Sequence, residues 1–177
     1  MDNIPAILQL GHPLLRQRAE AVDDVLSDST QQLIETLQVA LANSQGVGLA
    51  APQMGIAKRL VIVASRPTTR YPYAPLMLPT VMVNPSFAPV SEQQEKDWEG
   101  CLSIPGIRAL VPRYTDIAIR YTDSNGQTID QTLSGFVARV FQHEVDHLDG
   151  FVYLDRVLDN HDIVAESEFL KICGLAA

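Results

Sequence analysis

The sequence has little cysteine, few aromatic residues and no long apolar segment. Only two cysteines, Cys101 and Cys173, occur among 177 residues, which excludes a scaffold held by disulfides and leaves each thiol to be considered separately. No apolar run approaches the roughly 18–20 residues that a membrane-spanning helix needs. The start, Met1-Asp2-Asn3-Ile4-Pro5, lacks the basic and apolar regions of a signal peptide. We therefore expect a cytoplasmic protein with no membrane partner.

Positive charge is also scarce. The chain has 13 lysines and arginines against 21 aspartates and glutamates, a formal net charge of −8. Such a chain lacks the basic face of a protein that binds nucleic acid directly. Apolar residues make up 46% and charged residues 19%, which is an ordinary globular composition. We expect a single domain over residues 1–177, and we expect it to be a monomer.

The pattern of apolar residues and turn signals predicts an α+β fold. Strands are predicted over about 59–64, 81–84, 116–122 and 127–133, and the Asn-Gly dipeptide between the last two is favoured in hairpins. Helices are predicted from a cap at Asp28 or Ser29 to Asn43, from a cap at Ser134 to Leu148, and over 160–172. The stretch 46–53 is too poor in side-chain volume for an ordinary core strand. Irregular structure is predicted for an arm over 4–22 and for a loop rich in proline and tyrosine over 66–79.

The predicted helix that ends at Leu148 carries the pattern His-Glu-x-x-His. His143 and His147 are four residues apart, so a helix places both imidazoles on one face, where they can hold one metal ion. Glu144 is then placed to act as a general base on water at that metal. Asp146 either orients one of the imidazoles or pairs with an arginine. Several kinds of metal-dependent hydrolase use this pattern, so it leaves the reaction open.

A catalytic metal site of this kind needs a third protein ligand. A third histidine in an extended motif is excluded, because Tyr153 stands at its position. Glu166 and Glu168 follow His147 by 19 and 21 residues, close to the spacing of a glutamate ligand on a later helix. Cys101 is favoured over both. A thiolate binds divalent first-row metals strongly, and the glycine before it permits close approach of the backbone.

Three segments resemble the signature motifs of the peptide deformylase family. They are Gly46-Val47-Gly48-Leu49-Ala50-Ala51-Pro52-Gln53, Glu99-Gly100-Cys101-Leu102-Ser103 and Gln142-His143-Glu144-Val145-Asp146-His147. They occur in the order of the family and at compatible spacings. Gly11-His12-Pro13-Leu14-Leu15-Arg16 also resembles the start of the family, so the likeness covers most of residues 5–157.

The resemblance implies a hydrolase that removes the N-formyl group from the initiator methionine of newly synthesised chains. It implies mostly antiparallel sheets wrapped around a central helix that carries the two histidines. The implied metal ligands are Cys101, His143 and His147, with Fe(II) as the expected metal and Zn, Ni or Co able to substitute. The Gln53 amide and the Leu102 backbone N–H are the implied donors to the formyl oxygen.

Residues near these motifs are candidates for substrate binding. Phe136, seven residues before His143, shares its helix face, and together with Val47 it is predicted to line an apolar pocket for the methionine side chain. Gly46 and Gly48 are interpreted as positions where substrate backbone passes close to protein backbone.

Arg139, four residues before His143, allows two interpretations. Its stem lines the same pocket, or its guanidinium forms a structural ion pair, with Glu99 as the candidate partner. The loop over 66–79 has no role that the sequence assigns.

Two other functions stay open from the residues alone. One is a zinc metallopeptidase that uses His143, His147 and Glu166 or Glu168, and the other is a non-catalytic metal-binding protein.

The final segment bears on a further partner. It carries several acidic residues against a single lysine, so we expect at most weak, transient contact with the ribosome, whose RNA phosphates repel it. The acidic residues are Asp159, Asp162, Glu166 and Glu168.

Overall fold

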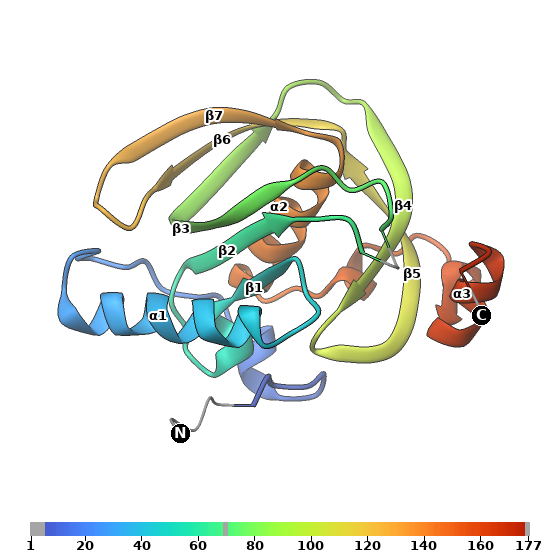
Figure 1. Cartoon of the computed structure of the whole chain (residues 1–177), viewed down its shortest axis with the longest axis horizontal. Coiled ribbons are helices and arrows are strands. Elements are labelled where there is room, and N and C mark those ends of the chain that lie inside the picture. Colours follow the sequence, from blue (N-terminus) through green and yellow to red (C-terminus); the bar gives the residue numbers. More distant parts are fainter. Residues whose placement is uncertain (1–5, 69–70, 176–177) are drawn as a thin grey trace.

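The computed structural model describes residues 6–68 and 71–175, which form two antiparallel sheets around a central helix (Figure 1). The larger sheet has the strand order β1-β2-β3-β6-β7 and the smaller sheet the order β4-β5-β8. The strands are β1 (Gly48–Ala50), β2 (Leu60–Ser65), β3 (Met77–Pro89), β4 (Gln94–Cys101), β5 (Ile104–Tyr114), β6 (Asp116–Thr122), β7 (Thr128–Ser134) and β8 (Ile163–Ala165).

The helices are α1 (Asp28–Ala42), α2 (Gly135–Leu148) and α3 (Glu166–Ile172). Short 3-10 turns cover Pro13–Arg16, Ala51–Met54, Tyr153–Arg156 and Asn160–Asp162. Helix α2 lies at the centre of the molecule, and α3 lies at its edge beside β5 (Figure 1). Within the described residues, every helix is too short or too polar to cross a membrane.

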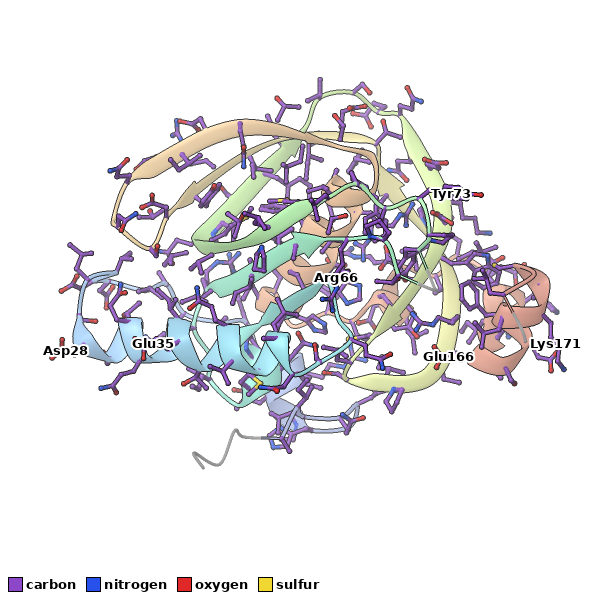
Figure 2. All side chains as sticks on the ribbon, viewed as in Figure 1. Asp28, Glu35, Arg66, Tyr73, Glu166 and Lys171 are labelled. Carbon is purple, nitrogen blue, oxygen red and sulfur yellow. The ribbon has the colours of Figure 1, made fainter. Side chains whose placement is uncertain are left out.

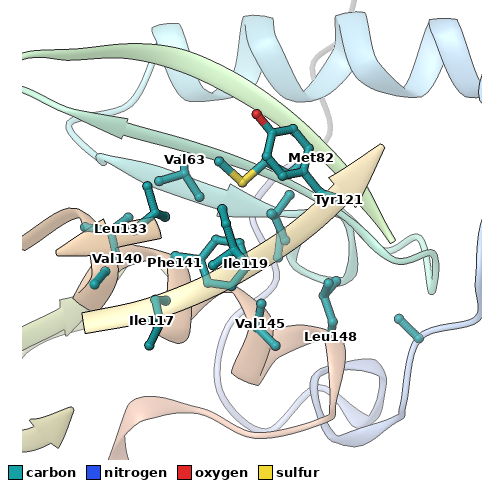
Figure 3. Packing of buried hydrophobic residues seen from close by; sticks show 14 residues of the cluster. Val63, Met82, Ile117, Ile119, Tyr121, Leu133, Val140, Phe141, Val145 and Leu148 are labelled. Carbon is teal, nitrogen blue, oxygen red and sulfur yellow. The ribbon is translucent and has the colours of Figure 1, made fainter. Parts of the chain in front are cut away.

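The larger sheet has an apolar layer on each face. Strand β2 is buried along its whole length, and its side chains alternate between the layers because successive residues of a strand point to opposite faces. Val61 and Val63 pack with residues of α2, whereas Leu60 and Ile62 pack with residues of α1. Figure 3 shows the layer that faces α2, in which Phe141 and Val145 of the helix meet Ile117, Ile119 and Met82 of the sheet.

The opposite face of α2 is polar and lies against the smaller sheet. The Gln142 side chain donates from Nε2 to the Tyr114 carbonyl (2.9 Å) and accepts from the Tyr114 N–H (3.1 Å). The Arg139 guanidinium donates to the Val111 carbonyl (2.7 Å). These bonds fix the helix against β5 and turn its histidines toward the end of β4, where Cys101 lies.

Several predicted elements are confirmed. The hairpin β6–β7 and helix α2 occur within one residue of their predicted positions, and Ser134 holds the N-cap position of α2. The cap of the first helix is wrong by one residue, because Ser27 accepts the Thr30 N–H through Oγ (3.3 Å). The small-residue stretch does contain a strand, the three-residue β1, which is fully buried.

Other elements differ from prediction because tertiary pairing decides them. Strand β3 begins at Met77, inside the predicted loop. Strand β4 was not predicted, since most of its residues are polar and its first four residues are exposed; its pairing with β5 holds it in place. The predicted helix over 160–172 is interrupted: Ile163–Ala165 forms β8 against residues 107–109 of β5, and α3 begins only at Glu166.

Candidate active site

The structure brings together the three predicted metal ligands. Cys101 ends β4, and His143 and His147 project from one face of α2. One ligand atom from each of the three lies within 4.8 Å of the others, and Cys101 Sγ is 3.2 Å from His147 Nε2. Both histidines are buried, and Cys101 is partly buried. Among the described residues, this is the group of histidine, cysteine and carboxylate side chains that converges in this way.

The electrostatics of the cluster suit metal binding. Burial raises the pKa of the Cys101 thiol, but the facing His147 and His143 outweigh burial, so that the pKa lies well below its ordinary value. A thiol that loses its proton readily is the form that ligates a metal. One thiolate and two imidazoles at this separation fit a divalent first-row transition metal and leave a further coordination position for water or substrate.

Glu99 fixes the orientation of one ligand. Its carboxylate accepts from His143 Nδ1 (2.9 Å), which leaves Nε2 of that ring for the cluster. The same carboxylate accepts two bonds from Arg113 (2.9 and 3.0 Å) and one from Arg139 (3.0 Å). Burial raises the pKa of Glu99, yet Arg113 and His143 outweigh it, so Glu99 is held as a carboxylate with a pKa far below its usual range.

The two open interpretations around this network are resolved. Asp146 pairs with Arg113 (2.6 Å) and Arg156 (2.6 Å), so it braces the arginines and does not orient an imidazole. Arg139 does both things considered for it: its side chain lines the pocket, and its guanidinium pairs with Glu99. The Glu95 and Val111 carbonyls accept further bonds from that guanidinium (2.6 and 2.7 Å).

Glu144 lies buried against strand β1. A Cβ added to Gly48 would come 2.2 Å from Glu144 Oε1, so the carboxylate occupies space that only glycine leaves open. The Glu144 side chain therefore requires glycine at position 48. This requirement is separate from the predicted close passage of substrate backbone, which stays a prediction. The other oxygen, Oε2, has no hydrogen-bond partner among the described residues. Burial, above all, raises the pKa of Glu144 to about 7.

Gln53 is held with its amide nitrogen beside the cluster. Its Oε1 accepts the Ala50 N–H (2.9 Å), and its Nε2 donates to Ser103 Oγ (3.1 Å) and lies 3.5 Å from Cys101 Sγ. The Gln53 side chain is buried, so this orientation is fixed. Leu102, in the tight turn between β4 and β5, lines the same pocket.

A pocket opens beside the cluster. The predicted substrate residues Val47, Gly48 and Phe136 line it together with Glu144. Sequence reasoning missed several other wall residues, among them Thr68 and Tyr71 from the unassigned loop. Tyr71 packs on Phe136 with ring centroids 4.8 Å apart. Trp98, Arg108 and Glu166 also line the pocket, and none of them was predicted as a wall residue.

The glutamates considered as alternative ligands lie elsewhere. Glu166 lines the pocket, but its carboxylate pairs with Arg108 (2.8 Å). Glu168 pairs with Lys171 (2.8 Å) on the exposed side of α3. Neither belongs to the group that converges with His143 and His147, so the ligand set of the metallopeptidase hypothesis is not assembled.

Comparisons with known proteins agree on one family. A sequence model described as polypeptide deformylase matches residues 4–162. A protein of a Nostoc species named peptide deformylase 2 is 50% identical over 166 residues, which span 94% of this chain and 93% of that one. Peptide deformylase 1 of Nitrosomonas europaea is 46% identical over 156 residues, which span 88% and 89% of the two chains.

Solved structures give the same result. A class I type b peptide deformylase from Acinetobacter baumannii, crystallised with Met-Ala-Ser, superposes with a TM-score of 0.85 at 38% identity. That alignment covers 89% of this chain and all of the other. A peptide deformylase from Synechococcus elongatus in complex with actinonin has a TM-score of 0.79 at 32% identity and covers all of this chain and 90% of its own.

Proposed function

The chain belongs to the polypeptide deformylase family, and on that premise we propose which of its residues remove the N-formyl group from N-formylmethionyl peptides. The observation that carries the assignment is the meeting of Cys101 with His143 and His147 within 4.8 Å, beside the buried Glu144. The family is metal-dependent, and these three side chains would hold its ion. We propose Fe(II), because thiolate and imidazole ligands suit it, with Zn, Ni or Co as substitutes.

The reaction adds water across an amide. When bound, the metal supplies Lewis-acid chemistry that polarises the formyl carbonyl and lowers the pKa of water. Glu144 takes a proton from the attacking water and delivers it to the nitrogen of methionine as the carbon–nitrogen bond breaks, which releases formate and a free amine. The unpartnered Oε2 of Glu144 supports this role, since it is available within a buried site.

Charge develops on the formyl oxygen during the attack and requires hydrogen-bond donors. We assign this role to the Gln53 side-chain amide and to the backbone N–H of Leu102. The anchored Gln53 amide, whose Nε2 lies 3.5 Å from Cys101 Sγ, supports the first assignment. A donor that is already fixed loses little entropy when the transition state forms.

The methionine side chain is assigned to the pocket beside the cluster. Val47 and Phe136 supply apolar surface there, and Gly48 keeps the backbone of β1 close to the catalytic carboxylate. The Acinetobacter relative was crystallised with Met-Ala-Ser, which is the peptide left when formyl-Met-Ala-Ser loses formate.

Product analysis tests the proposed function directly. Protein loaded anaerobically with Fe(II) should convert formyl-Met-Ala-Ser to formate and Met-Ala-Ser. A metallopeptidase would instead cut a peptide bond and yield formyl-Met and Ala-Ser. Mass spectrometry of the products separates the two reactions, and formation of formyl-Met would overturn the proposal.

We propose that residues 1–177 act as one monomeric domain in the cytoplasm, on nascent peptides, with at most weak contact to the ribosome. The acidic surface of the final segment supports the last point, because Asp159 and Glu168 are exposed. Salt-sensitive cosedimentation with ribosomes that depends on residues 158–177 would contradict it.

A further inference from the structure

The outer wall of the pocket includes a segment beyond the part of the chain that the family model matches. That match ends at residue 162, whereas strand β8 and helix α3 follow at 163–172. Strand β8 pairs with residues 107–109 of β5, and Lys96 of β4 forms an ion pair with Asp162 just before it. The final segment is therefore laid along the sheet that carries Cys101.

This segment places a carboxylate in the pocket wall. Glu166 is the first residue of α3, and its Oε1 accepts from Arg108 Nη2 (2.8 Å). Figure 2 shows Glu166 on the side of α3 that faces β5 and Lys171 on the outer side. The pair is well shielded from water, because the exposed fractions of the Arg108 and Glu166 side chains are 9% and 25%.

Arg108 lies directly against the metal-ligand motif. A Cβ added to Gly100 would come 1.7 Å from Arg108 Nη1, so the guanidinium fills the space beside the residue that precedes Cys101. Its Nη1 also lies 3.5 Å from the Tyr71 hydroxyl. The Arg108 guanidinium therefore contributes a positive charge to the pocket wall.

Aromatic packing secures the arrangement. Phe169, one turn along α3, is 2% exposed and meets Trp98 edge to face at 5.4 Å between ring centroids. The Arg108 guanidinium carbon lies 5.6 Å from the centre of the Phe169 ring. Because Trp98 also lines the pocket, a change in α3 is transmitted to the wall.

We propose that Glu166 is a specificity-determining residue, whose carboxylate holds Arg108 in the pocket wall and counters its charge, so that the site does not favour acidic residues after formyl-methionine. The inference rests on the proposed function. An arginine without this counter-charge attracts aspartate or glutamate side chains in the substrate and repels lysine. Discrimination between such peptides is a difference between two affinities, so a single charge change in the wall alters it.

The test measures kcat/KM for formyl-Met-Asp-Ser and formyl-Met-Lys-Ser. In Glu166→Gln, the amide still accepts from Arg108 but the negative charge is lost. We expect the ratio of the acidic to the basic substrate to rise about fivefold. Glu168→Gln removes the same charge from the same helix on its exposed side, and its ratio should stay within twofold of wild type. An unchanged ratio in Glu166→Gln, or equal rises in both variants, would overturn the proposal.

Two further measurements separate this proposal from the proposed function. Turnover of formyl-Met-Ala-Ser by the wild type tests the function itself. Binding of the unformylated peptides Met-Asp-Ser and Met-Lys-Ser, followed by the fluorescence of the single tryptophan, Trp98, tests the wall without turnover. The same shift in the affinity ratio is expected there. Glu166→Asp keeps the charge and should behave as wild type in both assays, whereas a shift like that of Glu166→Gln would contradict the role of charge.

Discussion

The inner part of the site and its outer wall are built in different ways. The inner part consists of the proposed metal ligands, Glu144 and Gln53, which come from three short motifs that have fixed local spacing. The outer wall consists of Tyr71, Trp98, Arg108 and Glu166, which come from a loop, two paired strands and the final helix. One helix and the strand ends beside it bring the inner residues together. The wall residues are brought together by the pairing of β5 with β4 and β8.

The reaction and the substrate selectivity therefore depend on different parts of the chain. The reaction needs side chains at fixed short distances, and helix geometry supplies these from sequence spacing alone. Selectivity depends on charges in the wall, which can change without disturbing the reaction. Changes in the inner part should therefore abolish turnover or metal binding, and changes in the wall should alter only substrate preference and local stability.

The largest effect is expected for Glu144→Gln. The amide keeps the shape of the side chain beside Gly48 but cannot transfer a proton, so kcat/KM for formyl-Met-Ala-Ser should fall about 1,000-fold. Metal content, measured on the same preparation, should stay at the wild-type level. A loss of less than tenfold would exclude Glu144 as the base.

Glu99→Gln should have the next largest effect, on stability and metal affinity. The change removes the buried charge that Arg113, Arg139 and His143 share, and loss of one partner in such a network costs about 3 kcal/mol. Urea unfolding measures this, and metal affinity should weaken about 10–100-fold because His143 loses its orienting bond. Asp130→Asn, in the exposed pair with Arg120, is the control and should leave the unfolding midpoint unchanged.

Two glycines of the first motif differ in what an added methyl group would meet. Gly48→Ala should lower kcat about 100-fold, because the new methyl displaces the Glu144 carboxylate, and misplacement by about 1 Å has this effect. In Gly46→Ala the nearest atom to the new methyl is the flexible end of Leu102 at 2.8 Å, and Ser44 Oγ and the Gly48 carbonyl oxygen follow at 3.2 and 3.3 Å, so this variant should cost less than tenfold. If both variants lose activity equally, displacement of the Glu144 carboxylate is not the cause of the loss.

The smallest effect is expected in the wall. Phe169→Leu removes the edge-to-face contact with Trp98 and the cation–π contact with Arg108, which together stabilise by about 1–2 kcal/mol. The free energy of unfolding, measured by thermal denaturation, should fall by that amount, and the fluorescence emission of Trp98 should change. Metal content and turnover of formyl-Met-Ala-Ser should stay within twofold of wild type. A loss of metal in this variant would show that wall and inner part are not separable.

The sequence predicted the inner part because its chemistry is local. Spacing in a helix placed His143 and His147 on one face, the chemistry of a thiolate favoured Cys101 as the third ligand, and the resemblance to the family supplied Gln53. The structure brings these four residues together. The hairpin β6–β7 was predicted from its Asn-Gly turn and its alternating apolar residues.

The wall could not be predicted in the same way. Most of the residues of β4 are polar, so nothing in their pattern indicates a strand that sets Trp98 beside the pocket. Glu166 was considered as a ligand and as one of the acidic residues of the final segment, and not as a wall residue, because spacing along the chain does not reveal that β8 would intervene and direct its carboxylate to Arg108. The approach of the Glu144 side chain to Gly48 was not predicted either, since that side chain lies on α2 and meets β1 only in the folded protein.

The proposed metal site can be tested in one experiment on wild type and Cys101→Ala, both prepared anaerobically with Fe(II). Metal content and formate release from formyl-Met-Ala-Ser are measured on the same samples. The wild type should hold about one metal ion per chain and release formate. Cys101→Ala should lose both properties while remaining folded. If Cys101→Ala keeps both its metal and its formate release, Cys101, His143 and His147 do not form the metal site.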